Sequence, residues 1–288
     1  MSVPCRLLTK RLPQAQRKGD VRRVSAQPRL QPHWLALSLA SVLGAKLEGG
    51  DLSPINAFLD RLQAKLQEIP DEDRRLLVVI AGHNGAGKTT IYRERIGGAL
   101  SAFLSTHINP DEVEQAIMLD LGEHSLTKGE FEKHAAEEAA RLRQQYLDQE
   151  ISFSFETVFS DPEQDKVGFM AEARRRGYLV LLIAVGLESI EKSKARVALR
   201  HSKGGHNVPE DRIESRYERV LLNFSHGARI STLAIYFDNS EDRIEDDLDT
   251  YWDIAFFENG ELVVKADSPP AWWNQVEHTF YRLNAGEM

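Results

Sequence analysis

One octapeptide constrains the fold of this chain more than any other feature. It matches the pattern GxxxxGK[ST] at every fixed position and consists of Gly82, His83, Asn84, Gly85, Ala86, Gly87, Lys88 and Thr89. A continuous apolar run over 76–81 precedes it, as in a buried parallel strand, and a predicted helix begins at Thr89. A glycine-rich turn between a strand and a helix lets backbone N–H groups and the helix N-terminus bind phosphate. The flanking elements disfavour the alternative, a chance glycine-rich turn.

This loop is expected to bind ATP together with Mg²⁺. Lys88 is placed to reach the β- and γ-phosphates, and the Thr89 hydroxyl is placed to ligate the metal. Thr90, the next residue, completes the set of expected nucleotide contacts. The chain has no NKxD motif for guanine recognition and no strand that ends in apolar residues followed by Asp-Glu. Those absences favour a kinase of small molecules over a GTPase or a motor ATPase.

The remainder of the chain alternates between strand-like and helical segments. After 76–81, strands are predicted near 101–108, 151–157, 178–185 and 231–237, and a hairpin with an Asn-Gly turn is predicted over 253–267. Such βαβ alternation is typical of a parallel sheet with helices on both faces. We therefore predict an α/β fold of the P-loop kinase type, with a parallel sheet flanked by helices and an N-terminal helical extension.

Three regions are expected along the chain: a basic tail over 1–32, a helical extension over 33–72 and a P-loop kinase domain over 73–288. The tail is rich in proline, lacks apolar periodicity and is expected to be disordered. The extension contains predicted helices at 34–47 and 53–69. The second helix has an apolar stripe of Ile55, Phe58, Leu59, Leu62 and Leu66.

Charge and composition exclude several classes of partner. The net charge is -8, although residues 1–32 contain eight Lys or Arg and one acid, so the rest of the chain is strongly acidic. An acidic body is a poor nonspecific binder of nucleic acid, and no apolar run approaches the roughly 18 residues of a membrane span. The single cysteine, Cys5, rules out a disulfide within the chain. We expect a cytoplasmic protein with no nucleic-acid or membrane partner.

Two acidic residues near predicted strand ends are candidates for chemistry. Asp111 lies in the sequence INPDE, where Asn109 is a predicted helix cap. The cap would fix the carboxylate that accepts the proton of an acceptor hydroxyl, although the motif alone also fits an ordinary helix start. Glu156, before Thr157, ends another predicted strand and is placed to bind the acceptor or to hold Mg²⁺-bound water.

A Gly-Gly pair at 204–205 separates two helical stretches that carry several arginines. These are Arg196 and Arg200 before it, and Arg212, Arg216 and Arg219 after it. Arginines around a flexible hinge can clamp a transferring phosphoryl group as a lid closes, whereas the alternative is a solvated helix face.

Four motifs together resemble the zeta toxin family of small-molecule kinases. They occur in the same order as in that family and are GHNGAGKT, INPDE, SFETVFS and GGHNVPEDRIESRYER. The resemblance extends over about 76–240. Four motifs in order are far more specific than a single one.

The resemblance implies an ATP-dependent kinase of the toxin type that phosphorylates a sugar hydroxyl of UDP-N-acetylglucosamine. It implies that Lys88 and Thr89 contact ATP and Mg²⁺. It also implies that Asp111 is the base and that Glu156 and Thr157 contact the acceptor, a small molecule.

The resemblance also implies two arginines that compensate charge on the transferring group. Arg196 is similar to one of them. Where some members carry an arginine just before the proline of the lid, this chain has His206, so Arg216 or Arg219 is expected to substitute. The predicted catalytic set is therefore Lys88, Asp111, Arg196 and Arg216.

Several questions stay open at the level of sequence. The acceptor is a nucleotide sugar or another hydroxylated metabolite, such as a nucleoside, a nucleotide or a dinucleotide. A switch that binds ATP without transferring phosphate is the alternative from another class. Family members are commonly inhibited by an antitoxin, so either an antitoxin partner or a cis-inhibitory N-terminal segment, formed by the predicted helices at 34–69, is expected here. The alternative for the helix over 53–69 is a structural element that completes the core.

Overall fold

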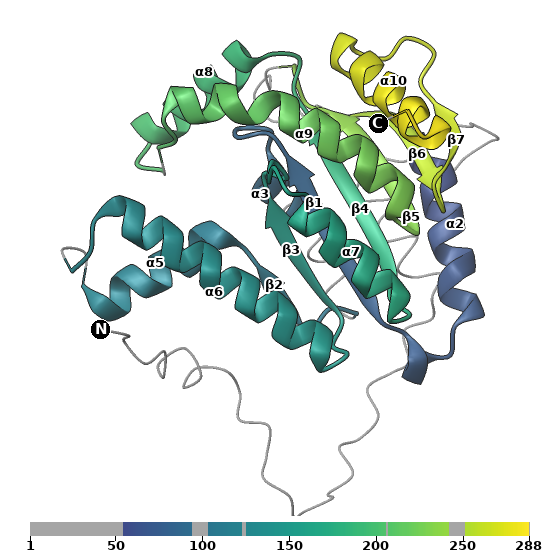
Figure 1. Cartoon of the computed structure of the whole chain (residues 1–288), viewed down its shortest axis with the longest axis horizontal. Coiled ribbons are helices and arrows are strands. Elements are labelled where there is room, and N and C mark those ends of the chain that lie inside the picture. The colour runs from purple at the N-terminus through teal and green to yellow at the C-terminus, as the bar shows by residue number, and fades with distance from the viewer. Residues whose placement is uncertain (1–53, 94–102, 123–124, 206, 242–250, 288) are drawn as a thin grey trace, which may run out of the picture.

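A seven-stranded sheet forms the centre of the chain (Figure 1). The computed structural model describes residues 54–93, 103–122, 125–205, 207–241 and 251–287. The strands are β1 (Leu76–Gly82), β2 (Thr106–Ile108), β3 (Phe153–Thr157), β4 (Leu179–Gly186), β5 (Leu233–Asp238), β6 (Trp252–Glu258) and β7 (Glu261–Lys265). Their order is β2-β3-β1-β4-β5-β6-β7; β1 to β5 are parallel, and β6 and β7 add an antiparallel hairpin.

Helices pack on both faces of this sheet. Those in the described ranges are α2 (Pro54–Glu68), α3 (Lys88–Ile91), α5 (Pro110–Leu121), α6 (Lys128–Asp148), α7 (Asp165–Arg175), α8 (Ile190–Ser202), α9 (Glu210–Ile230) and α10 (Ala271–Ala285). One core joins the sheet to α6, α7, α9 and α10, and the other joins it to α2 and α3. The sheet is thus the middle of three layers. Among these helices none is both long and apolar enough to cross a membrane.

The register of the central strands positions the P-loop. β1 lies between β3 and β4, and Ala81 pairs with Thr157 on one side and with Ala184 on the other. The carboxyl ends of these three strands therefore line up at one edge of the sheet. Ligands of open α/β sheets bind at this edge, where neighbouring strands connect to opposite faces.

The predicted α/β class is confirmed, with two differences in detail. The sheet is mixed, because the predicted hairpin joins its edge in antiparallel orientation. The strand predicted near 101–108 is limited to Thr106–Ile108 within the described residues. The remaining strands agree with the expected ranges to within a few residues.

Helix α2 is part of the sheet's core. Its buried residues include the predicted stripe of Ile55, Phe58, Leu59, Leu62 and Leu66. The helix contacts β5, β6 and β7, and the Ile55 N–H donates a 2.9 Å hydrogen bond to Asp253 Oδ2. This arrangement agrees with the structural alternative for the second N-terminal helix. The predicted tail and the predicted helix at 34–47 lie outside the described residues.

Helix α10 is anchored by two buried tryptophans, Trp272 and Trp273. The Trp272 indole donates to Asp238 Oδ1 at 2.6 Å and packs against Gly186, where an added Cβ would come within 2.3 Å of the ring. This packing holds the C-terminal helix against the ends of β4 and β5.

Candidate active site

The P-loop leads from β1 into α3, and its last glycine has a left-handed backbone. Gly87 has a φ of 88°, and an added Cβ would lie 2.6 Å from the Tyr251 hydroxyl and 2.7 Å from the Asn239 side-chain nitrogen. Tyr251 donates to the Gly87 carbonyl and Asn239 donates to the Ala86 carbonyl, both at 2.9 Å. Two side chains distant in sequence therefore fix the shape of the loop.

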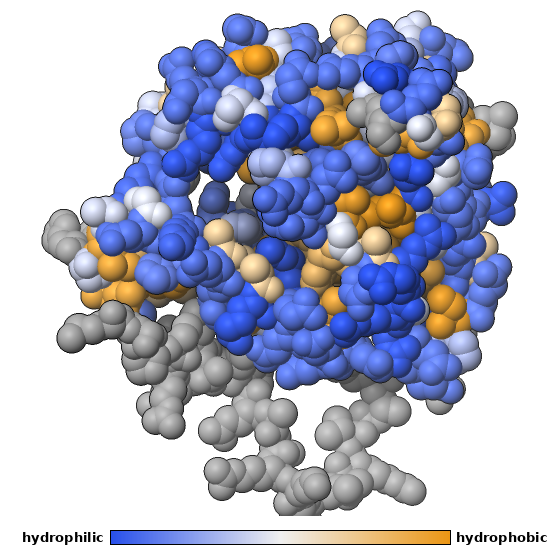
Figure 2. Space-filling view, viewed as in Figure 1, coloured by the Kyte–Doolittle hydropathy of each residue, from blue (hydrophilic) through white to orange (hydrophobic). Residues whose placement is uncertain are grey.

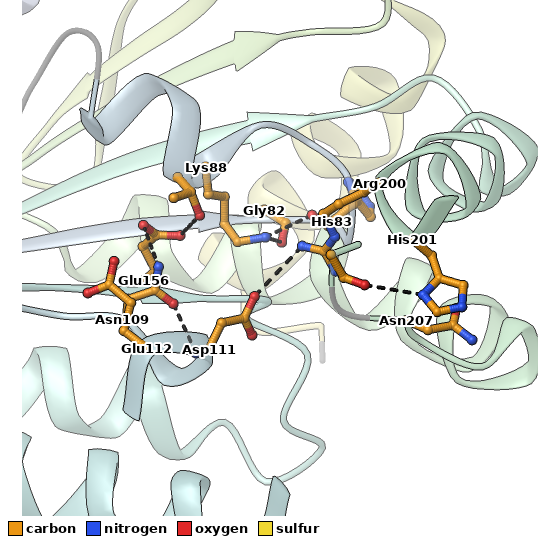
Figure 3. Close-up of polar contacts among 12 residues, drawn as sticks. Gly82, His83, Lys88, Asn109, Asp111, Glu112, Glu156, Arg200, His201 and Asn207 are labelled. Carbon is orange, nitrogen blue, oxygen red and sulfur yellow. Dashed lines mark hydrogen bonds and ion pairs between the residues drawn. The ribbon is translucent and has the colours of Figure 1, made fainter. Parts of the chain in front are cut away.

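Lys88 points back into the P-loop. Its Nζ donates to the carbonyl oxygens of Gly82 at 3.0 Å and His83 at 2.9 Å (Figure 3). Burial lowers the pKa of Lys88 to about 8, while the charges of Glu156 and Asp111 act in the opposite direction. An ammonium held among carbonyl oxygens and poorly hydrated is strongly attracted to a phosphate oxygen that replaces them.

Glu156 is the buried centre of a polar network at the end of β3. Its Oε2 accepts a 2.7 Å hydrogen bond from the Thr89 hydroxyl. Its Oε1 contacts His107 Nε2 at 3.2 Å and Asn109 Nδ2 at 3.3 Å. The His107 ring is itself held by the Ser154 hydroxyl at 2.8 Å. One carboxylate oxygen is thus fixed by β2 and its following loop, and the other faces the P-loop helix.

These donors fit a magnesium ion that is shared with phosphate. A hydroxyl and a carboxylate side by side are oxygen ligands of the kind that Mg²⁺ prefers, and Mg²⁺ in nucleotide sites commonly takes one or two protein ligands plus phosphate and water. No cluster of three or more His, Cys, Asp or Glu side chains that could hold a metal alone occurs in the described ranges. The Thr89–Glu156 pair therefore fits a metal that arrives with a nucleotide.

Asp111 lies across from the P-loop, in the first turn of α5. The Asn109 side chain caps this helix by accepting from the Asp111 N–H at 3.0 Å. The Asp111 carboxylate, about 50% exposed, lies 3.7 Å from the Arg200 guanidinium of α8 (Figure 3). The charges of Asp111 and Arg200 both act on the pKa of Lys88, so the three groups share one site.

Arg196 lies one helical turn before Arg200 and has different contacts. Its guanidinium donates to the backbone carbonyls of Asn239 at 2.5 Å and Glu241 at 2.6 Å. Its Cβ packs against the P-loop, since a Cβ added to Gly85 would come within 3.0 Å of it. The structure thus places Arg196 as a support of the loop and Arg200 beside Asp111.

The other predicted contacts have distinct environments. Arg216 is half-buried on α9, and its charge reaches Lys88. The Thr157 hydroxyl accepts from the Phe159 N–H at 3.0 Å and so stabilises the left-handed backbone of Phe159. Within the P-loop, the backbone carbonyl of Asn84 accepts a 2.6 Å hydrogen bond from the Ser193 hydroxyl.

The site opens into a cleft between two walls, one formed by α5 and α6 and the other by α8 and α9. Figure 2 shows the hollow between them, with strongly hydrophilic side chains on its α9 side. The walls touch at their far ends, where Lys128 donates to the Asn207 carbonyl at 2.9 Å and Arg212 pairs with Glu132. The two walls are therefore in contact at the far end of this hollow.

Comparison with known families decides the identity of this architecture. The zeta toxin family model matches residues 59–244, which is well over half of the chain and includes α2 from Leu59 onward, the P-loop, Asp111, Glu156 and α9. This chain belongs to the zeta toxin family. No curated protein is close enough in sequence to count as a relative.

Solved structures similar to this zeta toxin family member are distant in sequence. The AvrRxo1-ORF1:AvrRxo1-ORF2 complex with ATP has 17% identity and a TM-score of 0.54, covering 87% of this chain and 69% of that one. The same complex with sulphate ions has a TM-score of 0.53 at the same identity and coverage. The PezAT toxin–antitoxin system of Streptococcus pneumoniae has 14% identity and a TM-score of 0.49, covering 83% of this chain and 98% of that one. At these identities the AvrRxo1 likeness supports the fold alone.

Three residues of this zeta toxin site, Arg200, His107 and Asn239, are not in the predicted set of site residues. The sequence predicts Arg200 only as one of several arginines near the Gly-Gly pair at 204–205. Sequence spacing cannot show which arginine of α8 lies beside Asp111. His107 carried no usable signal in the sequence, because its contact with Glu156 depends on the pairing of β2 with β3, in which His107 lies opposite Ser154. Asn239 follows β5, and only the tertiary structure shows that it supports the P-loop.

Proposed function

We propose that this chain is an ATP-dependent kinase that phosphorylates a hydroxyl group of a nucleotide sugar, with UDP-N-acetylglucosamine as the first acceptor to test. The observation that carries the proposal is the position of Asp111, which lies opposite Lys88 and next to Arg200. A nucleotide switch needs the P-loop but has no use for a carboxylate held at the acceptor side. A kinase uses such a carboxylate as a base.

In the proposed reaction, Asp111 accepts the proton of the acceptor hydroxyl while the oxygen of that hydroxyl bonds to the γ-phosphorus of ATP. The bond between that phosphorus and the β–γ bridging oxygen breaks, and ADP leaves. Lys88 and Arg200 approach the same phosphoryl group from the P-loop and from α8, and stabilise the charge on its oxygens. Arg216, whose charge also reaches Lys88, is the second arginine of this proposal.

Thr89 and Glu156 are proposed to hold Mg²⁺. Bound there, the ion would neutralise charge on the β- and γ-phosphates of ATP. His107 and Asn109 fix the orientation of the Glu156 carboxylate through its other oxygen. Thr89 thereby contributes both to the first turn of α3 and to the proposed metal site.

Support for ATP comes from the site and from the fold. The AvrRxo1-ORF1:AvrRxo1-ORF2 complex, which shares the fold, was determined with ATP. Its assembly with a second protein also supports a partner for this chain, either an antitoxin or, in its place, the segment that precedes α2. Because α2 itself is a core helix, an inhibitory segment would be confined to residues 1–53.

The decisive experiment is a transfer assay with purified protein, ATP–Mg²⁺ and UDP-N-acetylglucosamine, repeated with Asp111→Ala. The kinase proposal expects a phosphorylated nucleotide sugar that the variant forms about 10²–10⁴-fold more slowly. A non-hydrolysable ATP analogue should bind both proteins equally, because Asp111 lies on the acceptor side. Transfer that continues at the wild-type rate in Asp111→Ala would exclude this residue as the base.

The same assay after removal of residues 1–50 tests inhibition in cis. If the N-terminal segment inhibits the kinase, the shortened protein should transfer phosphate faster than the full chain.

A further inference from the structure

Three arginines form a row on the cleft side of α9. Arg212, Arg216 and Arg219 are spaced four and three residues apart, which places them on one face of the helix. All three side chains are half-buried. The same face continues to Asn223, which is buried and donates to the carbonyls of Phe159 and Asp161. The row therefore runs from the tip of the cleft towards the loop that follows β3.

A fourth arginine approaches the same loop from the opposite wall. The Arg143 guanidinium of α6 lies over the Phe155 ring, 5.1 Å from its centroid, and interacts electrostatically with Asp161. Arg219 reaches this loop from α9, where its Nε donates to the Ser160 carbonyl at 2.8 Å. Arg143 and Arg219 thus flank the two consecutive residues Ser160 and Asp161.

The nearby carboxylates are already engaged with cations. Glu132 pairs with Arg212 and lies 3.9 Å from Lys128, and Asp161 forms a 3.2 Å ion pair with Lys166. Burial lowers the pKa of Arg216, and the charge of Arg212 lowers it further; the charge of Glu132 acts in the opposite direction, and that of Arg219 lowers the pKa again. Burial lowers the pKa of Arg143 as well.

Positive charge is therefore in excess between the two walls. Half-buried guanidinium groups that repel one another are unfavourable in the free protein, and an anion placed between them removes that repulsion.

We propose that Arg143 and Arg219, continued by Arg216 towards the P-loop, form a subsite for phosphate groups of the acceptor. The proposal rests on the proposed kinase function and deepens it, because it selects a phosphate-bearing acceptor over a neutral sugar or nucleoside. The planar guanidinium forms paired hydrogen bonds with phosphate oxygens, which suits this choice of residue. Arg216 lies within electrostatic reach of both Lys88 and Arg219.

The test uses UDP as the probe, so that no transfer is needed. The full chain is first saturated with Mg²⁺ and a non-hydrolysable ATP analogue, which occupies the P-loop, and UDP is then titrated by calorimetry. Arg219→Gln and Arg143→Gln are each expected to weaken UDP binding at least about tenfold, because each removes a charge-assisted contact. Arg219→Lys, which keeps the charge but not the paired geometry, is expected to restore part of the loss.

The matched control is Arg175→Gln on the outer side of α7, where the arginine side chain is 73% exposed. This variant should bind UDP as the wild type does. Unchanged affinity for the ATP analogue shows that each variant is folded. UDP binding that is absent in the wild type, or equal in all variants, overturns the subsite. UDP binding that depends on Arg219, without transfer to UDP-N-acetylglucosamine, keeps the subsite and rejects the proposed acceptor or reaction.

Discussion

The Thr89 hydroxyl and the Glu156 carboxylate are joined by a 2.7 Å hydrogen bond. The bond links the first turn of α3, which begins at the P-loop, to the end of the neighbouring strand β3. It brings together two oxygen donors that are 67 positions apart in the sequence. The hydroxyl at the start of α3 therefore holds one oxygen of the Glu156 carboxylate in place.

Glu156→Gln keeps the shape of the side chain and removes its charge. We expect phosphoryl transfer to fall about 10–100-fold, with a higher Mg²⁺ concentration needed for half-maximal rate, as for other groups that orient a metal site. The measurement is a Mg²⁺ titration of the transfer rate at saturating ATP. Glu112→Gln, an exposed acid on α5, is the control and should leave the titration unchanged. An unaltered Mg²⁺ requirement in Glu156→Gln would contradict the proposed metal site.

Arg200 and Arg196 should separate in their effects, although they are four residues apart on one helix. Arg200→Ala is expected to lower the turnover number about 10²–10³-fold with little change in affinity for an ATP analogue, since Arg200 lies beside Asp111. Arg196→Ala is expected to weaken nucleotide binding, because its contacts support the P-loop. Rapid-quench kinetics and calorimetry distinguish the two. If Arg196→Ala lowers the turnover number and Arg200→Ala weakens nucleotide binding, Arg196 would be the charge-compensating arginine instead.

Nucleotide affinity should depend on the protonation of Lys88. In the free protein its pKa is lowered to about 8, and bound phosphates raise it by favouring the ammonium form. Affinity for ADP should therefore be constant below about pH 8 and fall as pH rises above it, approaching tenfold per pH unit. Calorimetry between pH 7.5 and 9.5 in two buffers with different ionisation enthalpies should reveal proton uptake above about pH 8. Lys88→Ala should bind weakly and without this dependence.

Gly87→Ala tests the left-handed end of the P-loop. The new methyl group would meet the Tyr251 hydroxyl and the Asn239 amide within 2.7 Å, in a backbone conformation with a φ of 88°. We expect loss of nucleotide binding and a free energy of unfolding lower by about 1–2 kcal/mol. Urea denaturation and calorimetry provide the two readouts. Gly129→Ala on α6, where an added Cβ meets no atom within 4 Å, is the control.

Helix α2 should behave as a core element. Leu62 is fully buried on the sheet, so Leu62→Ala is expected to lower the free energy of unfolding by about 2–5 kcal/mol. Gln67→Ala, on the exposed side of the same helix, should change it by less than about 0.5 kcal/mol. Equal effects in urea denaturation would show that α2 does not contribute to the stability of the body.

Much of the fold could be read from local pattern. The apolar run before the P-loop, the Asn-Gly turn of the hairpin and the stripe of α2 each have a direct physical origin in burial or turn geometry. The sequence could not determine that β6 and β7 extend the central sheet. Strand order depends on which edges pair in three dimensions, and periodicity contains no information on that choice.

The site residues that could be predicted are those whose position follows from the strand and helix next to them in the sequence. Asn109 and Asp111 follow a strand and begin a helix, so their position at the sheet edge followed from local signals. Arg200 could not be chosen over Arg196, because residues four apart share one face of a helix and only the packing of α8 decides their reach. His107 could not be linked to Glu156 without the pairing of β2 with β3.

The walls of the cleft are joined by charge and hydrogen bonding at the points described: Arg212 with Glu132, Arg200 with Asp111, and Lys128 with Asn207. Partly exposed ion pairs of this kind contribute about 0–1 kcal/mol each and weaken as salt screens them. We therefore expect higher ionic strength to weaken the ion pairs between the walls. None of the residues that make these contacts belongs to either hydrophobic core, so an anion that took the place of an ion pair would leave both cores packed.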